Sequence, residues 1–324
     1  MATAPGRVQL PDEPLLSALE DRAAAWADEV GRMLLGRYGT LLHVEYKVPG
    51  ERSPVTAADR DAEAMLRAAI TREFPSHSIL GEEGEDLALH DEAFLWVLDP
   101  LDGTTNFING LPLFGVSIGV LYEGMPVAAA IFAATSHRGG PGVYAARRGG
   151  GARFAGEPLR LPLQAAPQPS RLAAQPAHFV RWGGVRREFR RHQGEVRTLG
   201  SVALELAYVA SGTLQYAIFG GPRIWDVAAG VLLVQEAGGL VVERQPGSTT
   251  WMPLHRFTPP PQRQPGDAVA GLAGLRRWRS SLVAGSPQVA GFVAEHLPAS
   301  PPSPWTRLVR SVARWVQGRR ARRS

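Results

Sequence analysis

The sequence predicts a mixed α/β fold of the α+β type, and three observations support this prediction. Apolar residues recur with helical spacing up to Ile70, which indicates two amphipathic helices. Short apolar runs bounded by glycine and proline follow between 78 and 147 and are typical of strands. After a proline-rich break at 162–169, strand and helix patterns alternate. A chain of 324 residues is long enough for one large domain or two closely packed domains with an ample core.

Individual elements follow from these patterns in chain order. The first helix places Leu16, Leu19, Ala23, Trp26, Val30 and Leu34 on one face, and the second places Ala62, Met65, Leu66, Ala69 and Ile70 on one face. Strands are expected near 78–81, 94–99, 113–122, 126–133 and 143–147. Helices are expected near 184–193, 202–211 and 226–237, the last followed by a glycine C-cap at 238–239.

Two aspartates end the apolar run at 94–98. Such a run is typical of a strand buried on both faces, and ligands in α/β folds gather just beyond the carboxyl ends of these strands. Pro100 turns the chain between Asp99 and Asp102, so both carboxylates can converge on one point. Mg²⁺ prefers oxygen ligands of this kind, and Gly103-Thr104-Thr105 adds open backbone N–H groups and hydroxyls that suit a phosphate oxygen. A polar turn that caps a strand would explain the same residues.

Two further acidic motifs repeat the pattern. Ser78–Gly81 is a second short apolar run, and it ends in Glu82 and Glu83. Asp226 follows Trp225 and opens a helix of small and aliphatic residues. In isolation, the glutamates are compatible with solvated charge and Asp226 with a helix N-terminal aspartate. The repetition favours a shared metal site.

Electrostatics and composition support a hard cation. Four or more carboxylates at one site repel one another unless cations compensate their charge. The chain has no cysteine, and its eight histidines are scattered, so a zinc site is not expected.

With these three motifs in this order, the chain resembles the inositol monophosphatase family over residues 15–243. These are Mg²⁺-dependent, lithium-sensitive phosphomonoesterases related in fold to fructose bisphosphatase. Val55-Thr56-Ala57-Ala58-Asp59 and Gly200-Ser201 are further matches. The resemblance implies a layered α-β-α-β-α sandwich, with the metals at the junction of its halves.

The resemblance also implies roles for individual residues. Glu82, Asp99 and the Leu101 carbonyl would bind a first Mg²⁺, and Asp99 would bridge to a second ion held by Asp102 and Asp226. Two or three ions would act in total, with Glu83 as a more peripheral ligand. The metals would activate a water that attacks phosphorus and would stabilise the alkoxide that leaves. The remaining implied positions are Glu82, Thr104 and Asp59 for the water, and Gly103, Thr104, Gly200 and Ser201 for the substrate.

Lys47 is the only lysine among thirty-five basic residues. It precedes Thr56 by nine residues, close to where the family places a lysine near its metals, although the spacing is one residue longer. A compact point charge at this position suggests a role beside phosphate or metal-bound water. A chance surface lysine is the alternative.

Phe219 occupies the position where inositol-selective members of the family carry a glutamate that binds a sugar hydroxyl. A phenyl ring cannot accept that hydrogen bond, so inositol phosphate is in doubt as the substrate. The ring could instead stack on a nucleobase, as in a 3'-phosphoadenosine 5'-phosphate phosphatase, or be buried without ligand contact. Histidinol phosphate and sugar phosphates are further candidates for the small phosphorylated metabolite.

The expected organisation has three parts. Residues 1–162 form an N-terminal half with most metal ligands, and 163–297 form a C-terminal half with Asp226 and the substrate loops. The second half includes a Pro/Arg-rich insertion at 244–279, which is expected to face solvent. Its last elements, a strand at 281–284 and a helix at 289–297, resemble the closing elements of the family.

Residues 298–324 form a Pro-Ser linker and a basic tail. The tail from Trp305 contains seven arginines and no acid, and without it the formal charge changes from +5 to −2. Its helical apolar spacing is typical of a basic amphipathic helix for an anionic membrane surface, a partner or nucleic acid, with a disordered solubilising tail as the alternative. No signal-peptide core is evident, so a cytoplasmic protein is expected, and the family suggests a homodimer. An inactive phosphatase fold that binds through this tail is the non-enzyme alternative.

Overall fold

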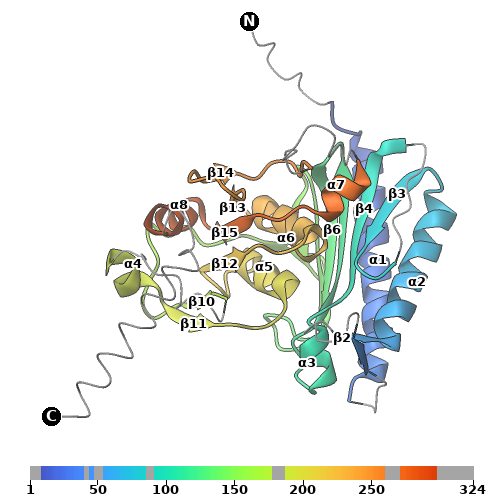
Figure 1. Ribbon diagram of the computed structural model, residues 1–324, viewed down its shortest axis with the longest axis horizontal. Coiled ribbons are helices and arrows are strands. Elements are labelled where there is room, and N and C mark those ends of the chain that lie inside the picture. The colour runs from blue at the N-terminus through green and yellow to red at the C-terminus, as the bar shows by residue number, and fades with distance from the viewer. Residues whose placement is uncertain are drawn as a thin grey trace, which may run out of the picture.

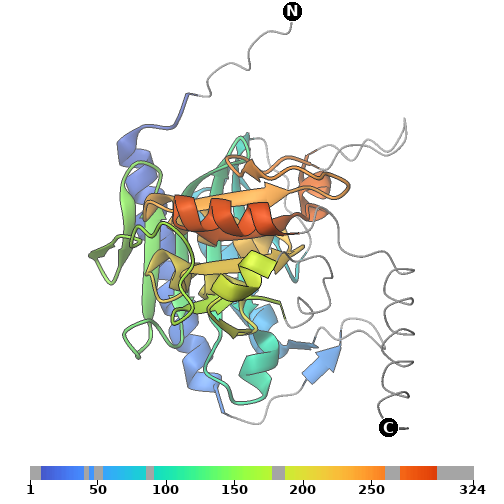
Figure 2. The same cartoon turned by 90° about the vertical axis from the view of Figure 1, so that its left-hand side faces the viewer.

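The computed structural model describes residues 9–39, 44–46, 54–84, 91–176, 187–259 and 271–297. These residues form five layers in the order helix, sheet, helix, sheet, helix, as the family resemblance implied (Figure 1). A quarter turn shows the outer helix α8 across the face of the second sheet (Figure 2). The tail at 298–324 lies outside the described residues.

The first layer consists of α1 (Glu13–Arg37) and α2 (Ala57–Glu73). Asp12 caps α1 because its carboxylate accepts a hydrogen bond from the Leu15 N–H at 3.1 Å. Both expected helices are confirmed, and their apolar faces pack with the first sheet in one buried cluster.

The second layer is a seven-stranded sheet in the sequential order β3 to β9, in which β3 and β4 are parallel and all other pairs are antiparallel. Its strands are almost wholly apolar because α1 covers one face and α6 the other. The strands are β3 (His77–Gly81), β4 (Asp91–Asp102), β5 (Gly115–Tyr122), β6 (Met125–Ala133), β7 (Gly142–Arg147), β8 (Gly151–Phe154) and β9 (Glu157–Leu159).

The end of β4 differs from the sequence-based expectation. The strand was expected to end at 99, but β4 continues to Asp102, with a register shift against β5 between Asp99 and Asp102. Pro100 lies within this shift and, lacking an N–H, cannot donate to the ladder. The shift keeps both aspartates on the strand and changes the direction of the chain between them.

The middle layer contains α5 (Val202–Ala210) and α6 (Ile224–Glu236). Small residues allow α6 to pack closely on both sides. A Cβ at Gly119 of β5 would lie 2.9 Å from the Ala228 Cβ, and one at Gly230 would lie 2.5 Å from the Leu206 Cβ. The helix ends before Gly238, which has a φ of 88° as a glycine C′ residue often has.

The second sheet has the order β11-β10-β12-β15-β13-β14 and combines parallel and antiparallel pairs. Helices α4 (Arg187–His192) and α8 (Pro287–His296) form the outer layer on it (Figure 1). The strands are β10 (Leu172–Ala174), β11 (Glu195–Arg197), β12 (Tyr216–Gly220), β13 (Leu240–Arg244), β14 (Met252–Pro253) and β15 (Ser281–Gly285).

Three short elements complete the described fold. Strands β1 (Val44–Tyr46) and β2 (Pro54–Thr56) pair antiparallel, and α3 (Thr104–Ile108) follows β4 directly. None of the helices in the described part of the chain combines the length and apolar character needed to cross a bilayer.

Many described residues at 244–279 are exposed, as expected, but the expectation is wrong for three apolar side chains. Leu254, Phe257 and Trp278 are at most 3% exposed and belong to the core between the two sheets. The Phe257 and Trp278 rings meet edge to face at 4.9 Å between centroids. Helix α7 (Leu272–Arg276) lies in the same segment. A few apolar anchors therefore hold a segment whose composition is dominated by proline and arginine.

Candidate metal and phosphate site

A pocket of about 230 Å³ brings the three acidic motifs together. Its walls come from the ends of β3 and β4, from the start of α3 and from the start of α6. The lining residues are Glu82, Asp99, Leu101, Asp102, Gly103, Thr104, Thr105, Gly200, Val202 and Asp226. We call it the carboxylate pocket.

Asp99 and Asp102 are fixed by local hydrogen bonds. The Asp99 carboxylate accepts from the Leu101 N–H at 3.2 Å. The Asp102 carboxylate accepts from the Ser201 hydroxyl at 2.7 Å and from the Ala203 N–H at 2.5 Å. Ser201 is also the N-cap of α5. The Ser201 hydroxyl, expected to contact substrate, therefore orients Asp102 and joins it to the start of α5.

Glu82 lies in a loop that is held from one side by α2. The Glu63 carboxylate accepts from the Glu83 N–H at 2.7 Å and from the Gly84 N–H at 2.8 Å, and it pairs with Arg67 at 2.7 Å. Glu63 was not anticipated from the sequence. The available signal was a glutamate on the otherwise apolar face of α2. Glu83 does not line the carboxylate pocket.

The same loop is held from the other side by a residue far along the chain. Nη2 of Arg276 donates to the Gly81 carbonyl oxygen at 2.5 Å and to the Gly84 carbonyl oxygen at 3.1 Å. Its guanidinium carbon lies 5.4 Å from the centroid of the Trp225 ring, next to Asp226. Arg276 therefore links the Glu82 loop to the start of α6.

Asp226 stands in the first turn of α6. Its carboxylate accepts from the Arg223 backbone N–H at 2.7 Å, as a helix N-terminal aspartate does. The preceding Trp225 carbonyl accepts from the buried Ser117 hydroxyl of β5 at 3.3 Å. Asp226 therefore caps the start of α6 and also lines the pocket with the other acids, as the two interpretations of this residue predicted.

Thr104 and Asp59 meet across the rim of the pocket. The Thr104 hydroxyl has two acceptors within reach, the Leu101 carbonyl at 3.0 Å and the Asp59 carboxylate at 3.3 Å. Asp59 is 1% exposed in the first turn of α2. Gly103 has a φ of 92°, so glycine suits the step from β4 into α3.

Burial and mutual repulsion raise the carboxylate pKa values. Burial raises the pKa of Asp99 well above its usual value, and the charges of Glu82, Asp102, Asp226 and Asp59 raise it further. Burial likewise raises the pKa of Asp102 to about 6, against hydrogen bonds from Ser201 and Ala203, and that of Asp226 to about 8. A positive charge in the pocket would reverse these shifts.

The oxygen ligands that the pocket offers are of the kind that a hard cation prefers. They belong to four carboxylates and the backbone around Leu101, with no histidine or thiol in the lining. Among the described residues, no three acidic or histidine side chains are already grouped around a single ion position. A bound ion would therefore have to draw the carboxylates inward from their present hydrogen bonds.

A second pocket of about 270 Å³, which we call the Phe219 pocket, adjoins the carboxylate pocket because Gly200 and Val202 line both. Phe219 is 4% exposed. Glu205 was not anticipated and lines the same pocket. Burial raises its pKa to about 7, against hydrogen bonds from the Leu199 and Gly200 N–H groups. Lys47 lies outside the described residues.

Comparison with known proteins gives a consistent result. The model of the inositol monophosphatase family matches residues 16–271. Inositol-1-monophosphatase of Rhizobium meliloti (strain 1021) is 35% identical over 224 residues, which cover 68% of this chain and 83% of that protein. Nus factor SuhB of Escherichia coli (strain K12) is 35% identical over 223 residues, which cover 66% of this chain and 81% of that protein.

Solved structures agree. Extragenic suppressor protein suhB from Bartonella henselae superposes with a TM-score of 0.68 at 28% identity, over 86% of this chain and 98% of that chain. Inositol monophosphatase from Anabaena (Nostoc) sp. PCC 7120 superposes with a TM-score of 0.63 at 30% identity, over 87% and 96%.

Proposed function

The chain belongs to the inositol monophosphatase family, and on this premise we propose that it is a Mg²⁺-dependent phosphomonoesterase that acts on a small phosphorylated metabolite. The observation that supports the proposal most is the carboxylate pocket. It gathers four acids, of which Asp99 and Asp102 are buried and Glu82 and Asp226 are partly buried. The pKa values of Asp99, Asp102 and Asp226 are raised by burial and by the neighbouring carboxylates. Such a cluster is costly to keep charged without cations.

We assign the ligands as follows. Glu82, Asp99 and the Leu101 carbonyl would hold one Mg²⁺, while Asp99, Asp102 and Asp226 would hold a second. Bound Mg²⁺ supplies Lewis acidity and lowers the pKa of a coordinated water. Glu83 would act from outside the pocket, through the loop that carries Glu82.

Thr104 and Asp59 would orient the attacking water. The Thr104 hydroxyl proton is directed to the Leu101 carbonyl or the Asp59 carboxylate, so its lone pairs are free to accept a hydrogen bond from water. Glu82 would accept the proton that this water loses. Gly103, Thr104 and Thr105 line the pocket, and their N–H groups would bind the phosphate oxygens.

Phe219 argues against inositol phosphate as the preferred substrate. It occupies the Phe219 pocket beside Glu205, and its ring offers apolar area but no acceptor. We therefore include 3'-phosphoadenosine 5'-phosphate and histidinol phosphate as alternative substrates.

The test is Mg²⁺-dependent phosphate release, with and without lithium, from inositol 1-phosphate, 3'-phosphoadenosine 5'-phosphate, histidinol phosphate and fructose 1,6-bisphosphate. One preferred, lithium-sensitive substrate is expected. Asp99→Asn should abolish turnover, whereas the matched control Glu157→Gln, an exposed acid on β9, should retain it. Turnover by Asp99→Asn at the wild-type rate would overturn the proposal.

A binding role is a second candidate, because several relatives carry the name Nus factor SuhB and the tail adds seven arginines. In this case the tail would bind nucleic acid or an anionic membrane surface. Binding of the full chain to RNA and to anionic vesicles, compared with a chain ending at Leu297, tests it. Binding lost together with the tail, in a protein inactive on all four substrates, would favour this candidate.

A further inference from the structure

The segment after residue 271 brings arginines to the edge of the carboxylate pocket. Figure 1 shows α7 beside the strands of the first sheet, and Arg276 makes this contact through its bonds to Gly81 and Gly84. The family match ends at residue 271, before this helix. The arginines of α7 and of the residues that follow it lie outside the matched residues.

Arg223 approaches the same place from α6. Its guanidinium carbon lies 5.6 Å from the centroid of the Trp225 ring, and that of Arg276 lies 5.4 Å from it. Burial lowers the pKa of Arg223, and the positive charges of Arg279 and Arg276 lower it further, whereas Asp226 and Glu82 raise it. Gly220 of β12 pairs with Ser281 of β15, so the stretches that carry Arg223 and Arg279 leave neighbouring strand ends. With Arg276, these arginines lie close to Asp226 and Glu82 of the pocket.

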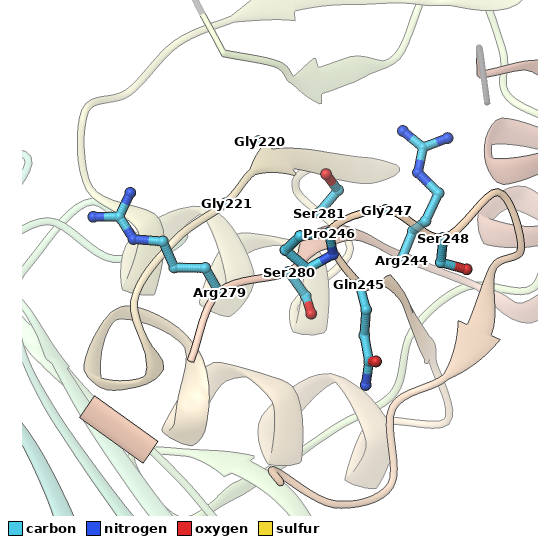
Figure 3. Close-up of a pocket in the computed structure, with 10 residues that line it drawn as sticks. All are labelled: Gly220, Gly221, Arg244, Gln245, Pro246, Gly247, Ser248, Arg279, Ser280 and Ser281. Carbon is cyan, nitrogen blue, oxygen red and sulfur yellow. The ribbon is translucent and has the colours of Figure 1, made fainter. Parts of the chain in front are cut away.

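Arg279 borders a third pocket of about 350 Å³, which we call the Arg279 pocket and which is drawn in Figure 3. Its side chain extends past Gly221, away from Arg244 and Ser281, and it is exposed. In the part of the chain that the structure describes, no acidic side chain forms a salt bridge with Arg223 or Arg279. By contrast, Arg147 pairs with both Glu13 and Glu20.

The three pockets adjoin in series. Gly200 and Val202 line both the carboxylate pocket and the Phe219 pocket, and Gly220 and Gly221 line both the Phe219 pocket and the Arg279 pocket. Arg223 follows directly after Pro222, which lines the Phe219 pocket. A ligand that starts among the carboxylates and crosses the Phe219 pocket would therefore meet Arg223 and Arg279.

Guanidinium groups that repel each other are stabilised by an anion between them. A guanidinium offers a planar fork of N–H donors that matches a phosphate, and its hydrogen bonds to an anion are about twice as strong as neutral ones. Arg276 donates to two backbone carbonyls and so adds positive charge from a fixed position.

The geometry points to a second anion subsite formed by Arg223 and Arg279, which binds a second phosphate of an organic bisphosphate whose scissile phosphate lies in the carboxylate pocket. This inference deepens the proposed function and rests on it. Arg279 is then a residue that determines specificity, and the preferred substrates are bisphosphates over the corresponding monophosphates.

The test compares substrates that differ only in the second phosphate. These are 3'-phosphoadenosine 5'-phosphate against adenosine 3'-phosphate, and fructose 1,6-bisphosphate against fructose 1-phosphate. For at least one pair, kcat/KM of the wild-type chain should be higher for the bisphosphate than for the monophosphate. Arg279→Gln should lower this preference by about ten-fold, the effect of one charge-assisted hydrogen bond. The neighbouring and exposed Arg277→Gln is the matched control and should keep it.

A ratio measured on one preparation is insensitive to any unfolded fraction. If Arg279→Gln leaves the ratio unchanged, or lowers both substrates of a pair equally, the subsite is overturned. Calorimetric binding of 3'-phosphoadenosine 5'-phosphate in EDTA separates the two proposals. Weaker binding by Arg279→Gln without hydrolysis by the wild type would overturn only the proposed function. Hydrolysis without any preference for a bisphosphate would overturn only the subsite.

Discussion

Arg276 donates a 2.5 Å hydrogen bond to the carbonyl oxygen of Gly81, a residue 195 positions earlier in the chain. Gly81 immediately precedes Glu82, and Glu63 binds the next two N–H groups of the same loop. The loop is therefore fixed from α2 on one side and from α7 on the other. Its position depends on two segments that are far apart in the sequence.

Arg276→Gln should weaken Mg²⁺ binding by about ten-fold, because outer residues that orient a metal ligand contribute at this level. The shorter amide cannot reach both carbonyls as the guanidinium does. Isothermal titration of Mg²⁺ into the variant measures the effect, with Arg277→Gln as the control. Equal Mg²⁺ affinity in the two variants would show that the contact does not position Glu82.

Glu63→Gln should lower the free energy of unfolding by about 1–3 kcal/mol. The substitution removes a buried carboxylate that accepts hydrogen bonds from two backbone N–H groups and pairs with Arg67. Urea unfolding measures the change. The exposed Glu29→Gln on α1 serves as the control and should remain within about 0.5 kcal/mol of wild type. A midpoint for Glu63→Gln that matches this control would contradict the assignment.

Mg²⁺ should raise the melting temperature of the wild-type chain, because it binds the folded carboxylate pocket and relieves the repulsion there. At about 100 times its Kd, the ion would add about 2.7 kcal/mol to stability. Scanning calorimetry with and without Mg²⁺ tests this. Asp226→Asn should reduce the shift, whereas Glu157→Gln should not. A shift of the same size in Asp226→Asn would exclude that residue as a ligand.

Glu205 should make stability fall with rising pH. Its pKa is raised to about 7 by burial, from an ordinary value of 4.5 in the unfolded chain. Between these values the folded protein holds a proton that the unfolded chain has released, so the free energy of unfolding decreases as pH rises. The stabilisation is complete below pH 4.5 and is lost above about pH 7.

Glu205→Gln should flatten this decrease, because the amide keeps an acceptor for the Leu199 N–H but has no charge to bury. Urea unfolding of the metal-free proteins should be measured from pH 5 to pH 8. Relative to wild type, the free energy of unfolding of the variant should increase by roughly 1–3 kcal/mol between pH 5 and pH 8. Parallel curves for the two proteins would refute the role of Glu205. The exposed Glu295→Gln is the control.

Local patterns were enough to predict the strands and helices that carry the pocket. The apolar runs before Glu82 and Asp99 became β3 and β4, and the small-residue run after Asp226 became α6. The packing of β3 beside β4 then brings the first two motifs together. These features depend on residues within one element or its neighbour, which is the range over which periodicity is informative.

Contacts between distant segments could not be predicted in the same way. Ser201 reaches Asp102 across 99 positions, and Arg276 reaches Gly81 across 195. The family resemblance marked Ser201 as a substrate position and not as the partner of Asp102, and nothing in the local sequence distinguishes Arg276 from other arginines. Trp278 was misplaced for a related reason: one buried indole anchors its segment, although the surrounding composition suggests exposure.

The close approach of β5 to α6 has a genetic consequence. Only a hydrogen fits at Gly119, where any side chain would press on Ala228, two positions along α6 from Asp226. An alanine at Gly119 would displace the start of that helix without touching the pocket. A random mutagenesis screen for inactive clones should therefore recover Gly119 together with the acids themselves.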